Sequence, residues 1–329
     1  MINSPALISP LAIAPMIDWT YSHFRVLMRF LAPRALLYTE MQSTGAVLHK
    51  PERTLHYSVL EQPLALQVGG SDPDALAQCA HLAEEHGFAE LNLNLGCPSD
   101  KVQAGRFGAC LMKEPQRVVE CLVAMKQASN LPITVKTRIG VDDHEGYAFF
   151  ASFVEELIKA GCDKVIVHAR KALLKGLNPK QNRTVPPLHY DYVYRVKSIC
   201  DSIPVVLNGQ VLSVAEVHQH LQHIDGVMIG RLAYQHPYAI AEIHHALYPE
   251  HGLASRMAVL ENYLDYAEQA LKQAAPKSLL LKPLFNFAHG LVNAKRWKNQ
   301  LMNQQQSQQP IDAKSLLMLM SELVHFEGC

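Results

Sequence analysis

The stretch 91–112 reads LNLNLGCPSDKVQAGRFGACLM and changes from an apolar alternation into a Gly-Cys-Pro corner and a basic, glycine-bearing loop. Every second residue from Leu91 to Leu95 is leucine and the residues between are asparagine, which is the two-residue period of a strand with one buried face. Cys97 follows between a glycine and a proline, and proline has one fixed backbone torsion. The pattern therefore predicts a strand that ends at a rigid corner carrying a thiol.

The thiol of Cys97 has two interpretations. At the end of a strand it can act as an acid, a nucleophile or a metal ligand. The alternative is a small buried side chain, because free cysteine is among the most buried residue types. The choice depends on which side chains surround the corner.

The first 230 residues repeat a strand followed by a helix. Eight short apolar runs stand at 11–16, 36–41, 64–69, 90–95, 131–137, 164–169, 204–208 and 226–230. Helical spacing lies between most of them, for example at 74–86, 115–128 and 147–160. This alternation over about 230 residues predicts an α/β fold, a parallel TIM (β/α)₈ barrel. The alternative is a doubly wound open sheet, but no GxGxxG opens the first helix.

Beyond residue 248 the alternation gives way to helical spacing. Apolar stripes recur at 257–271, 280–291 and 316–323, and the polar run 303–310 separates the last two helices. We therefore expect two domains, a barrel over 1–248 that carries the chemistry and an all-helical C-terminal domain over 249–329.

Composition excludes some classes of function. Lys and Arg number 30, as do Asp and Glu together, so global charge gives no argument for a nucleic-acid partner. The seven cysteines include no CxxC pair and the 17 histidines no HExxH, so we expect no disulfide framework and no metal site. No apolar run has transmembrane length, and residues 1–15 lack the positive region of a secretory signal. We expect a cytoplasmic protein without a membrane partner.

Polar residues follow the predicted strands at their carboxyl ends, where the active sites of (β/α)₈ barrels lie. Each residue alone has an ordinary structural explanation, such as a loop hydrogen bond or a solvated charge. Their recurrence at one end of successive strands favours an active site. The set is Pro15, Met16, Ile17, Gln67, Asn94, Cys97, Lys136, Arg138, His168, Asn208, Gly209, Gly230 and Arg231.

The last two strand ends indicate a phosphate site. Asn208-Gly209 and Gly230-Arg231 offer backbone N–H groups and a guanidinium where barrels commonly bind phosphate. Lys136 would lie deeper in the mouth, where a positive charge could stabilise an electron-rich ring such as a reduced flavin. Another phosphorylated molecule would satisfy the same pattern.

Several motifs together resemble the tRNA-dihydrouridine synthases, and specifically their A branch. They are APMIDWT (14–20), LALQVGG (64–70), the stretch 91–112, VKTRIGVDD (135–143), HARKALLKGLNPKQNR (168–183), LNG (207–209) and GVMIGRLAY (226–234). The resemblance implies an FMN enzyme that uses NADPH to reduce uridine in the tRNA D-loop, at positions 20 and 20a. It also implies that the helical domain binds tRNA.

The resemblance also assigns roles to residues. It implies that Cys97 donates a proton to the uracil ring, so we expect a protonated thiol. The implied FMN contacts are Pro15, Met16, Ile17, Gln67, Lys136, His168, Asn208, Gly209, Gln210, Gly230 and Arg231. Two departures stand out: the family usually reads WTDRH where this chain has a tyrosine and a serine at 21 and 22, and NGG where it has Gln210.

Two basic stretches could hold a polyanion. Residues 170–183 and 272–298 carry several Lys and Arg and no Asp or Glu. The alternative is two solvated faces. We expect Asn94, Arg138, Lys180 and Arg183 to contact tRNA, and we expect a monomer. Two other functions stay open: a flavin barrel acting on a small free pyrimidine, and a tRNA-binding protein without catalysis.

Overall fold

In the computed structural model, which describes residues 9–325, nine parallel strands form one sheet. They are β1 (Leu11–Ile13), β2 (Leu36–Tyr38), β3 (Gln42–Ser43), β4 (Leu64–Gly69), β5 (Glu90–Leu95), β6 (Ile133–Arg138), β7 (Lys164–His168), β8 (Val205–Asn208) and β9 (Gly226–Ile229). The sheet closes because β1 pairs with both β2 and β9 while β2 pairs with β4. The short β3 only extends the pairing of β4. The predicted eight-stranded barrel is thus confirmed, and its closure excludes an open sheet.

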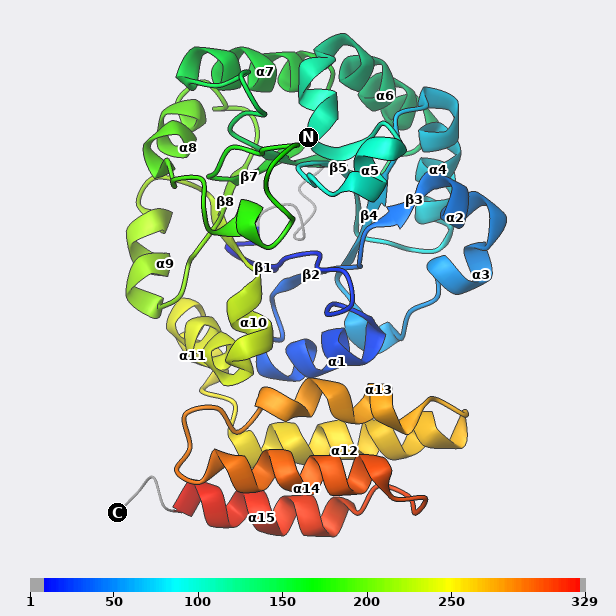
Figure 1. Ribbon diagram of the computed structural model, residues 1–329, viewed down its shortest axis with the longest axis vertical. Helices are drawn as coiled ribbons and strands as arrows, with labels where there is room; N and C mark the ends of the chain where they lie inside the picture. The colour runs from blue at the N-terminus through cyan, green and yellow to red at the C-terminus, as the bar shows by residue number, and fades with distance from the viewer. Residues whose placement is uncertain (1–8, 326–329) are drawn as a thin grey trace. The chain divides into compact units, whose positions relative to one another are not determined.

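Helices surround this ring of strands (Figure 1). They are α2 (Thr44–His49), α3 (Pro51–Thr54), α4 (Pro73–Glu85), α5 (Asp100–Ala104), α6 (Pro115–Ala128), α7 (Tyr147–Lys159), α8 (Tyr190–Lys197) and α9 (Val214–Leu221). Local sequence starts them: Asp72 accepts a hydrogen bond from the Asp74 N–H at 3.1 Å, and proline occupies the first position of α4. The helices predicted at 74–86, 115–128 and 147–160 correspond to α4, α6 and α7.

The barrel interior is filled by two sets of inward-facing side chains. An apolar cluster comprises Ala12, Ala14, Leu36, Tyr38, Ala65, Ile166, Val206 and Met228. Polar side chains occupy the remaining positions, which lie mainly on β4 to β7, and include Gln67, Glu90, Asn92, Asn94, Thr134 and Lys164. Because strand residues alternate between faces, the residues between them point outward to the helices. The interior is therefore apolar on one side and hydrogen-bonded on the other.

The described residues divide into two compact units, one of residues 9–20 and 36–230 and one of residues 21–35 and 231–325. Besides 3₁₀ turns the second unit contains α1 (Ser22–Leu31), α10 (Arg231–Gln235), α11 (Pro237–Leu247), α12 (Arg256–Lys272), α13 (Lys277–Leu281), α14 (Ala294–Gln306) and α15 (Ala313–His325). The predicted domain boundary after residue 248 stays a prediction. None of the helices within residues 9–325 combines the length and apolar composition that a membrane crossing needs.

The apolar stripes of the second unit have different outcomes. The stripes at 257–271 and 316–323 lie within α12 and α15. The stripe at 280–291 does not form one helix, because α13 ends at Leu281 and a 3₁₀ turn, Lys282–Asn286, follows. Pro283 explains the change, since proline cannot donate the backbone bond that continues an α-helix.

Candidate active site

The corner after β5 holds Cys97 by hydrogen bonds from its own backbone. The Asn94 side-chain oxygen accepts the Gly96 N–H at 3.1 Å and the Cys97 N–H at 3.0 Å. The thiol is partly exposed and donates to the Ser99 hydroxyl at 3.5 Å. Cys97 is therefore a fixed thiol within reach of solvent, and the alternative of a buried packing residue does not apply.

The loop after this corner returns beneath it. The Ala109 N–H donates to the Cys97 carbonyl at 2.9 Å. Gly108 makes this possible: its φ is +78°, and an added Cβ would come within 2.6 Å of the Cys97 carbonyl oxygen. Any side chain at this position would displace the corner, so a glycine at 108 is needed to support it.

Lys136 lies on β6 beside the corner and bonds to a neutral partner. Its ammonium donates to the Asn208 side-chain oxygen at 2.9 Å. Burial lowers the pKa of Lys136 to about 7, and the positive charge of Arg138 adds to this effect. A nearby anion would favour the protonated form, and the predicted role of Lys136 beside a cofactor stays a prediction.

The ends of β7 and β8 approach each other at Gly209. The φ of Gly209 is +126°, and an added Cβ would lie 3.0 Å from the His168 ring. Gln210 adopts φ +54°, and its side-chain oxygen accepts from the Arg170 guanidinium at 2.7 Å. The Gln210 side chain is thus turned to Arg170, which explains how this chain accommodates a residue where the family has glycine.

A threonine shapes the loop after β1, in which Pro15, Met16 and Ile17 were predicted to contact a cofactor. The Thr20 hydroxyl accepts the Met16 N–H at 2.8 Å and donates to the Met16 carbonyl at 3.2 Å. Ile17 is 55% exposed. Gly230 directly follows β9, where an added Cβ would lie 3.7 Å from atoms of Ala14 and Met16, and Arg231 begins α10.

Two of the predicted site residues, Gln67 and Arg138, are buried and form several hydrogen bonds within the protein. Gln67 is 1% exposed, donates to Asn92 and accepts from Asn94. Arg138 is 3% exposed, and its guanidinium donates to the carbonyls of Gly96, Lys171 and Asn182 at 2.9, 3.1 and 2.9 Å. Arg138 therefore fastens the corner after β5 to two points of the loop after β7, and its predicted contact with tRNA stays untested.

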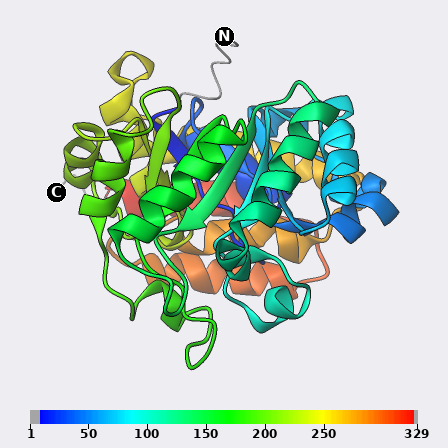
Figure 2. The same ribbon diagram turned by 90° about the horizontal axis from the view of Figure 1, so that it is seen from above.

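The loops after β5 and β7 project on the same side of the barrel (Figure 2). The Gln103 amide links them, donating to the carbonyls of Pro98 at 2.9 Å and Leu174 at 3.0 Å. The buried Asn182 closes the second loop on itself through hydrogen bonds to Leu173. Sequence reasoning missed both residues, since an amide in a loop carries no signal of its partner.

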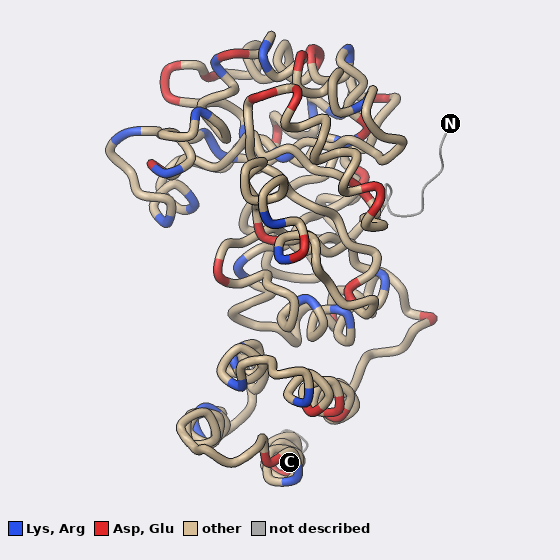
Figure 3. The backbone as a smooth tube through the Cα atoms, turned by 90° about the vertical axis from the view of Figure 1, so that its right-hand side faces the viewer, with Lys and Arg blue, Asp and Glu red and all other residues tan. Residues whose placement is uncertain are grey.

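The basic loop 170–183 is less available than its composition suggests. Arg170 is buried, and Lys171 pairs with Glu145. Lys175, Lys180 and Arg183 are exposed. In the second basic stretch Trp297 is fully buried and donates to the Leu284 carbonyl at 2.7 Å, so it belongs to the core. Figure 3 marks the Lys and Arg of both stretches along the chain.

The family departure at Tyr21 also has a structural counterpart, within the second unit. The Tyr21 hydroxyl donates to the Leu279 carbonyl at 3.0 Å. His23 bonds to the Tyr266 hydroxyl at 2.6 Å. In place of an acidic and basic pair, this chain uses neutral hydrogen bonds inside the helical unit.

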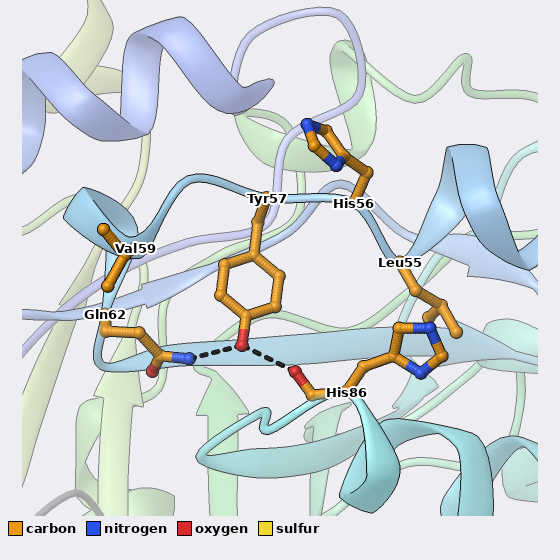
Figure 4. Close-up of a pocket in the computed structure, with 6 residues that line it drawn as sticks. All are labelled: Leu55, His56, Tyr57, Val59, Gln62 and His86. Carbon is orange, nitrogen blue, oxygen red and sulfur yellow. Dashed lines mark hydrogen bonds between the residues drawn. The ribbon is translucent and has the colours of Figure 1, made fainter.

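A surface hollow of about 470 Å³ lies elsewhere, at the amino end of β4 (Figure 4). The Tyr57 hydroxyl in it accepts from the Gln62 amide and donates to the His86 carbonyl, each at 2.7 Å. These bonds tie the segment before β4 to the end of α4. The hollow faces away from the strand ends that carry Cys97, so it is not part of the candidate site.

No group of three or more His, Cys, Asp and Glu side chains between residues 9 and 325 is arranged to hold a metal ion. The site instead combines a thiol, a lysine of lowered pKa and bare backbone at the strand ends.

Known proteins are similar in sequence to this chain over most of its length. The sequence profile described as Dihydrouridine synthase matches residues 12–322. A tRNA-dihydrouridine(20/20a) synthase of Shewanella oneidensis is 48% identical over 291 residues, 88% of this chain and 87% of the relative. Those of Xanthomonas axonopodis pv. citri and Synechocystis sp. are 50% and 44% identical, covering 88% and 91% of this chain and 87% and 90% of theirs. The chain therefore belongs to the dihydrouridine synthase family.

Proposed function

We propose that this protein reduces uridine to dihydrouridine in the D-loop of tRNA, at positions 20 and 20a, with FMN as bound cofactor and NADPH as reductant. The observation that carries the proposal is the Cys97 corner, which presents a partly exposed thiol at the carboxyl end of the barrel in a chain of this family. The names of its relatives support tRNA as the substrate.

The strand ends fit a phosphorylated, anionic cofactor. The backbone at Gly209 carries no side chain, its φ of +126° is one that other residues rarely adopt, and an added Cβ would lie 3.0 Å from the His168 ring. Within residues 9–325 the Lys136 ammonium bonds to the neutral Asn208 amide and to no carboxylate, so an anionic group beside it would stabilise its protonated form. The residues that would hold FMN are Pro15, Met16, Ile17, Gln67, Lys136, His168, Asn208, Gly209, Gln210, Gly230 and Arg231.

Reduction of the uracil C5–C6 bond requires a hydride at C6 and a proton at C5. FMN held by these residues would supply the hydride, with NADPH as its reductant. The Cys97 thiol gives the proton to C5, and the bonds from Asn94 keep its backbone in place while it does so. To reach the thiol, the target base must leave its stack, which a tRNA loop permits more easily than a duplex.

Replacement of Cys97 tests the proton transfer. In single-turnover reduction of tRNA by prereduced enzyme we expect Cys97→Ala to lower the rate by about 10² to 10⁴, the usual effect of losing a general acid. Cys110→Ala is a matched control, because Cys110 lies in the same loop and donates to the Phe107 carbonyl at 3.1 Å. Equal rates for Cys97→Ala and wild type would remove this residue from the mechanism.

We propose that the exposed cations of loop 170–183 contact tRNA phosphates. Replacing both Lys180 and Arg183 by alanine should reduce the slope of log K against log salt by roughly 1 to 2, since each phosphate contact contributes about 0.7 to 0.9. The control is Arg117→Ala with Lys159→Ala, two cations of α6 and α7 that pair with nearby glutamates. An unchanged slope would contradict the contact, and efficient turnover of free uridine would favour a small pyrimidine substrate.

The proposal extends to the helical C-terminal domain, 249–329, as a second tRNA-binding surface through the cations of 272–298. Some of these are already paired, for example Lys272 with Glu268 and Arg296 with Glu322. Because tRNA is the proposed substrate, we expect the enzyme to act in the cytoplasm. We also expect it to be a monomer.

A further inference from the structure

A continuous chain of hydrogen bonds crosses the barrel interior from the start of β5 to the Cys97 corner. From the Glu90 carboxylate it passes through the Thr134 hydroxyl and the Asn92, Gln67 and Asn94 amides, with successive distances of 2.9, 2.8, 2.8 and 2.9 Å. The Asn94 oxygen then accepts the Cys97 N–H at 3.0 Å. We call this chain the relay; its five side chains are each no more than 8% exposed.

Both ends of the relay fix its direction independently. A carboxylate can only accept, so Thr134 must donate to Glu90 and accept from Asn92. Each following amide must then donate from its nitrogen toward Glu90 and accept at its oxygen from the next residue. At the other end a backbone N–H can only donate, so Asn94 must present its oxygen to Cys97. The two requirements agree, and no amide in the relay can turn over alone.

The Glu90 end is held by two further donors. The Lys164 ammonium forms a buried ion pair with the second carboxylate oxygen. The Tyr38 hydroxyl donates to the oxygen that Thr134 also uses. Burial, with the charge of Glu90 adding to it, raises the pKa of Tyr38 well above its usual value, so the phenol keeps its proton. Both carboxylate oxygens thus accept from donors, Tyr38 and Thr134 on one and Lys164 on the other, which is the condition for the direction of the relay.

We propose that Glu90 is a positioning residue for Cys97: through Thr134, Asn92 and Gln67 it holds the Asn94 oxygen against the backbone of the corner. The inference rests on the proposed function, in which Cys97 is the proton donor. If a link is lost, the Asn94 amide can rotate and bring its NH₂ group to face the Cys97 N–H, where two donors repel. The corner then loosens and the thiol leaves its position over the substrate.

Thr134→Val tests the relay by removing one hydroxyl without changing the shape of the side chain. In the free protein we expect the Gly96 and Cys97 amides to exchange hydrogen at least about fivefold faster, as loss of a typical hydrogen bond implies. At saturating tRNA the single-turnover rate should fall by roughly tenfold to 100-fold, the effect of a small misplacement. The tRNA concentration for half-maximal rate should change much less than the rate, since the exposed cations proposed to hold tRNA phosphates, Lys180 and Arg183, lie outside the relay.

Two variants separate positioning from general loss of stability. Thr134→Ser keeps the hydroxyl and should restore both exchange protection and rate. Val135→Ala removes packing from the next residue of β6, whose buried side chain points away from the interior. It should lower stability without selectively exposing the Gly96 and Cys97 amides. If Thr134→Val fails to fold, Asn92→Leu breaks the next link and should give the same local exchange.

Wild-type exchange at Gly96 and Cys97 in a folded Thr134→Val or Asn92→Leu variant would overturn the relay, even in an enzyme that makes dihydrouridine. The same holds if Val135→Ala accelerates these two amides as much as Thr134→Val does. The proposed function fails by a different measurement, an unchanged rate in Cys97→Ala, and the exchange results would still decide the relay.

Discussion

Two lysines enter the barrel interior from neighbouring strands, and they differ in what compensates their charge. Lys164 begins β7 near the amino end of the barrel and pairs with the Glu90 carboxylate, both side chains being nearly inaccessible at 3% and 0% exposure. Lys136 lies on β6 toward the carboxyl end and donates to the neutral Asn208 amide at 2.9 Å. In the described part of the chain its ammonium has no carboxylate partner. The lysine charge at the amino end of the barrel is therefore compensated by a carboxylate, whereas the lysine charge at the carboxyl end is uncompensated.

The difference separates structure from function within a single interior. An ion pair that solvent does not reach is also out of reach of a ligand, so Lys164 and Glu90 can only hold other groups in place. A half-buried lysine with a neutral partner loses part of its hydration without gaining an opposite charge, and the pKa of Lys136 is lowered to about 7. An arriving anion would restore the charge. The uncompensated end is therefore the end that is able to bind a ligand.

Breaking the Lys164–Glu90 ion pair at the amino end of the barrel should have the largest effect on stability. Lys164→Met leaves the Glu90 carboxylate buried without its cation, so we expect a loss of about 3–5 kcal/mol in the free energy of unfolding. Ile166→Val on the same strand removes one methylene from the apolar side of the interior and should lose only about 0.5–1.5 kcal/mol. Urea unfolding followed by circular dichroism compares the two.

A double variant sharpens the same contrast. Glu90→Leu combined with Lys164→Met removes both charges, so it should recover much of the stability that the single change loses. If Lys164→Met lowered the free energy of unfolding no more than Ile166→Val does, the ion pair would not be what stabilises the amino end of the barrel.

The fold could be predicted because it depends on patterns that are local in sequence. The eight apolar runs, the glycines and prolines that end them and the helical spacing between them were enough for the barrel. The positions of Cys97, Lys136 and Asn208 at the strand ends followed from the same alternation. The stripe at 280–291 was misjudged, because apolar spacing outweighed Pro283.

What the sequence could not provide is the partner of each polar side chain. Glu90 and Lys164 stand 74 residues apart and meet only because of the strand order and register of a closed barrel. Arg138 was predicted to contact tRNA, and nothing in the sequence indicates that its guanidinium donates to three backbone carbonyls. Both cases need the three-dimensional arrangement, since a charged residue looks the same in sequence whether it is exposed or paired.

A smaller effect, distinguished by its pH dependence, is expected at the uncompensated end. Lys136 has a usual pKa of 10.5 in the unfolded chain and about 7 in the folded protein. Between these values the unfolded state binds more protons, so the folded state gains stability as pH rises. Lys136→Met abolishes this titration, so the variant should be more stable than wild type below pH 7. The gap should close by up to about 1.4 kcal/mol per pH unit between pH 7 and pH 9.

Urea unfolding of the cofactor-free protein at several pH values measures this gap. Lys159→Met, at an exposed ion pair on α7, is the control and should differ from wild type by a nearly constant amount. A gap for Lys136→Met that stays constant from pH 6 to pH 9 would mean that Lys136 keeps its proton without a ligand. The two ends of the barrel would then not differ in the way that their hydrogen bonds imply, because a neutral amide would compensate a buried ammonium as well as a carboxylate does.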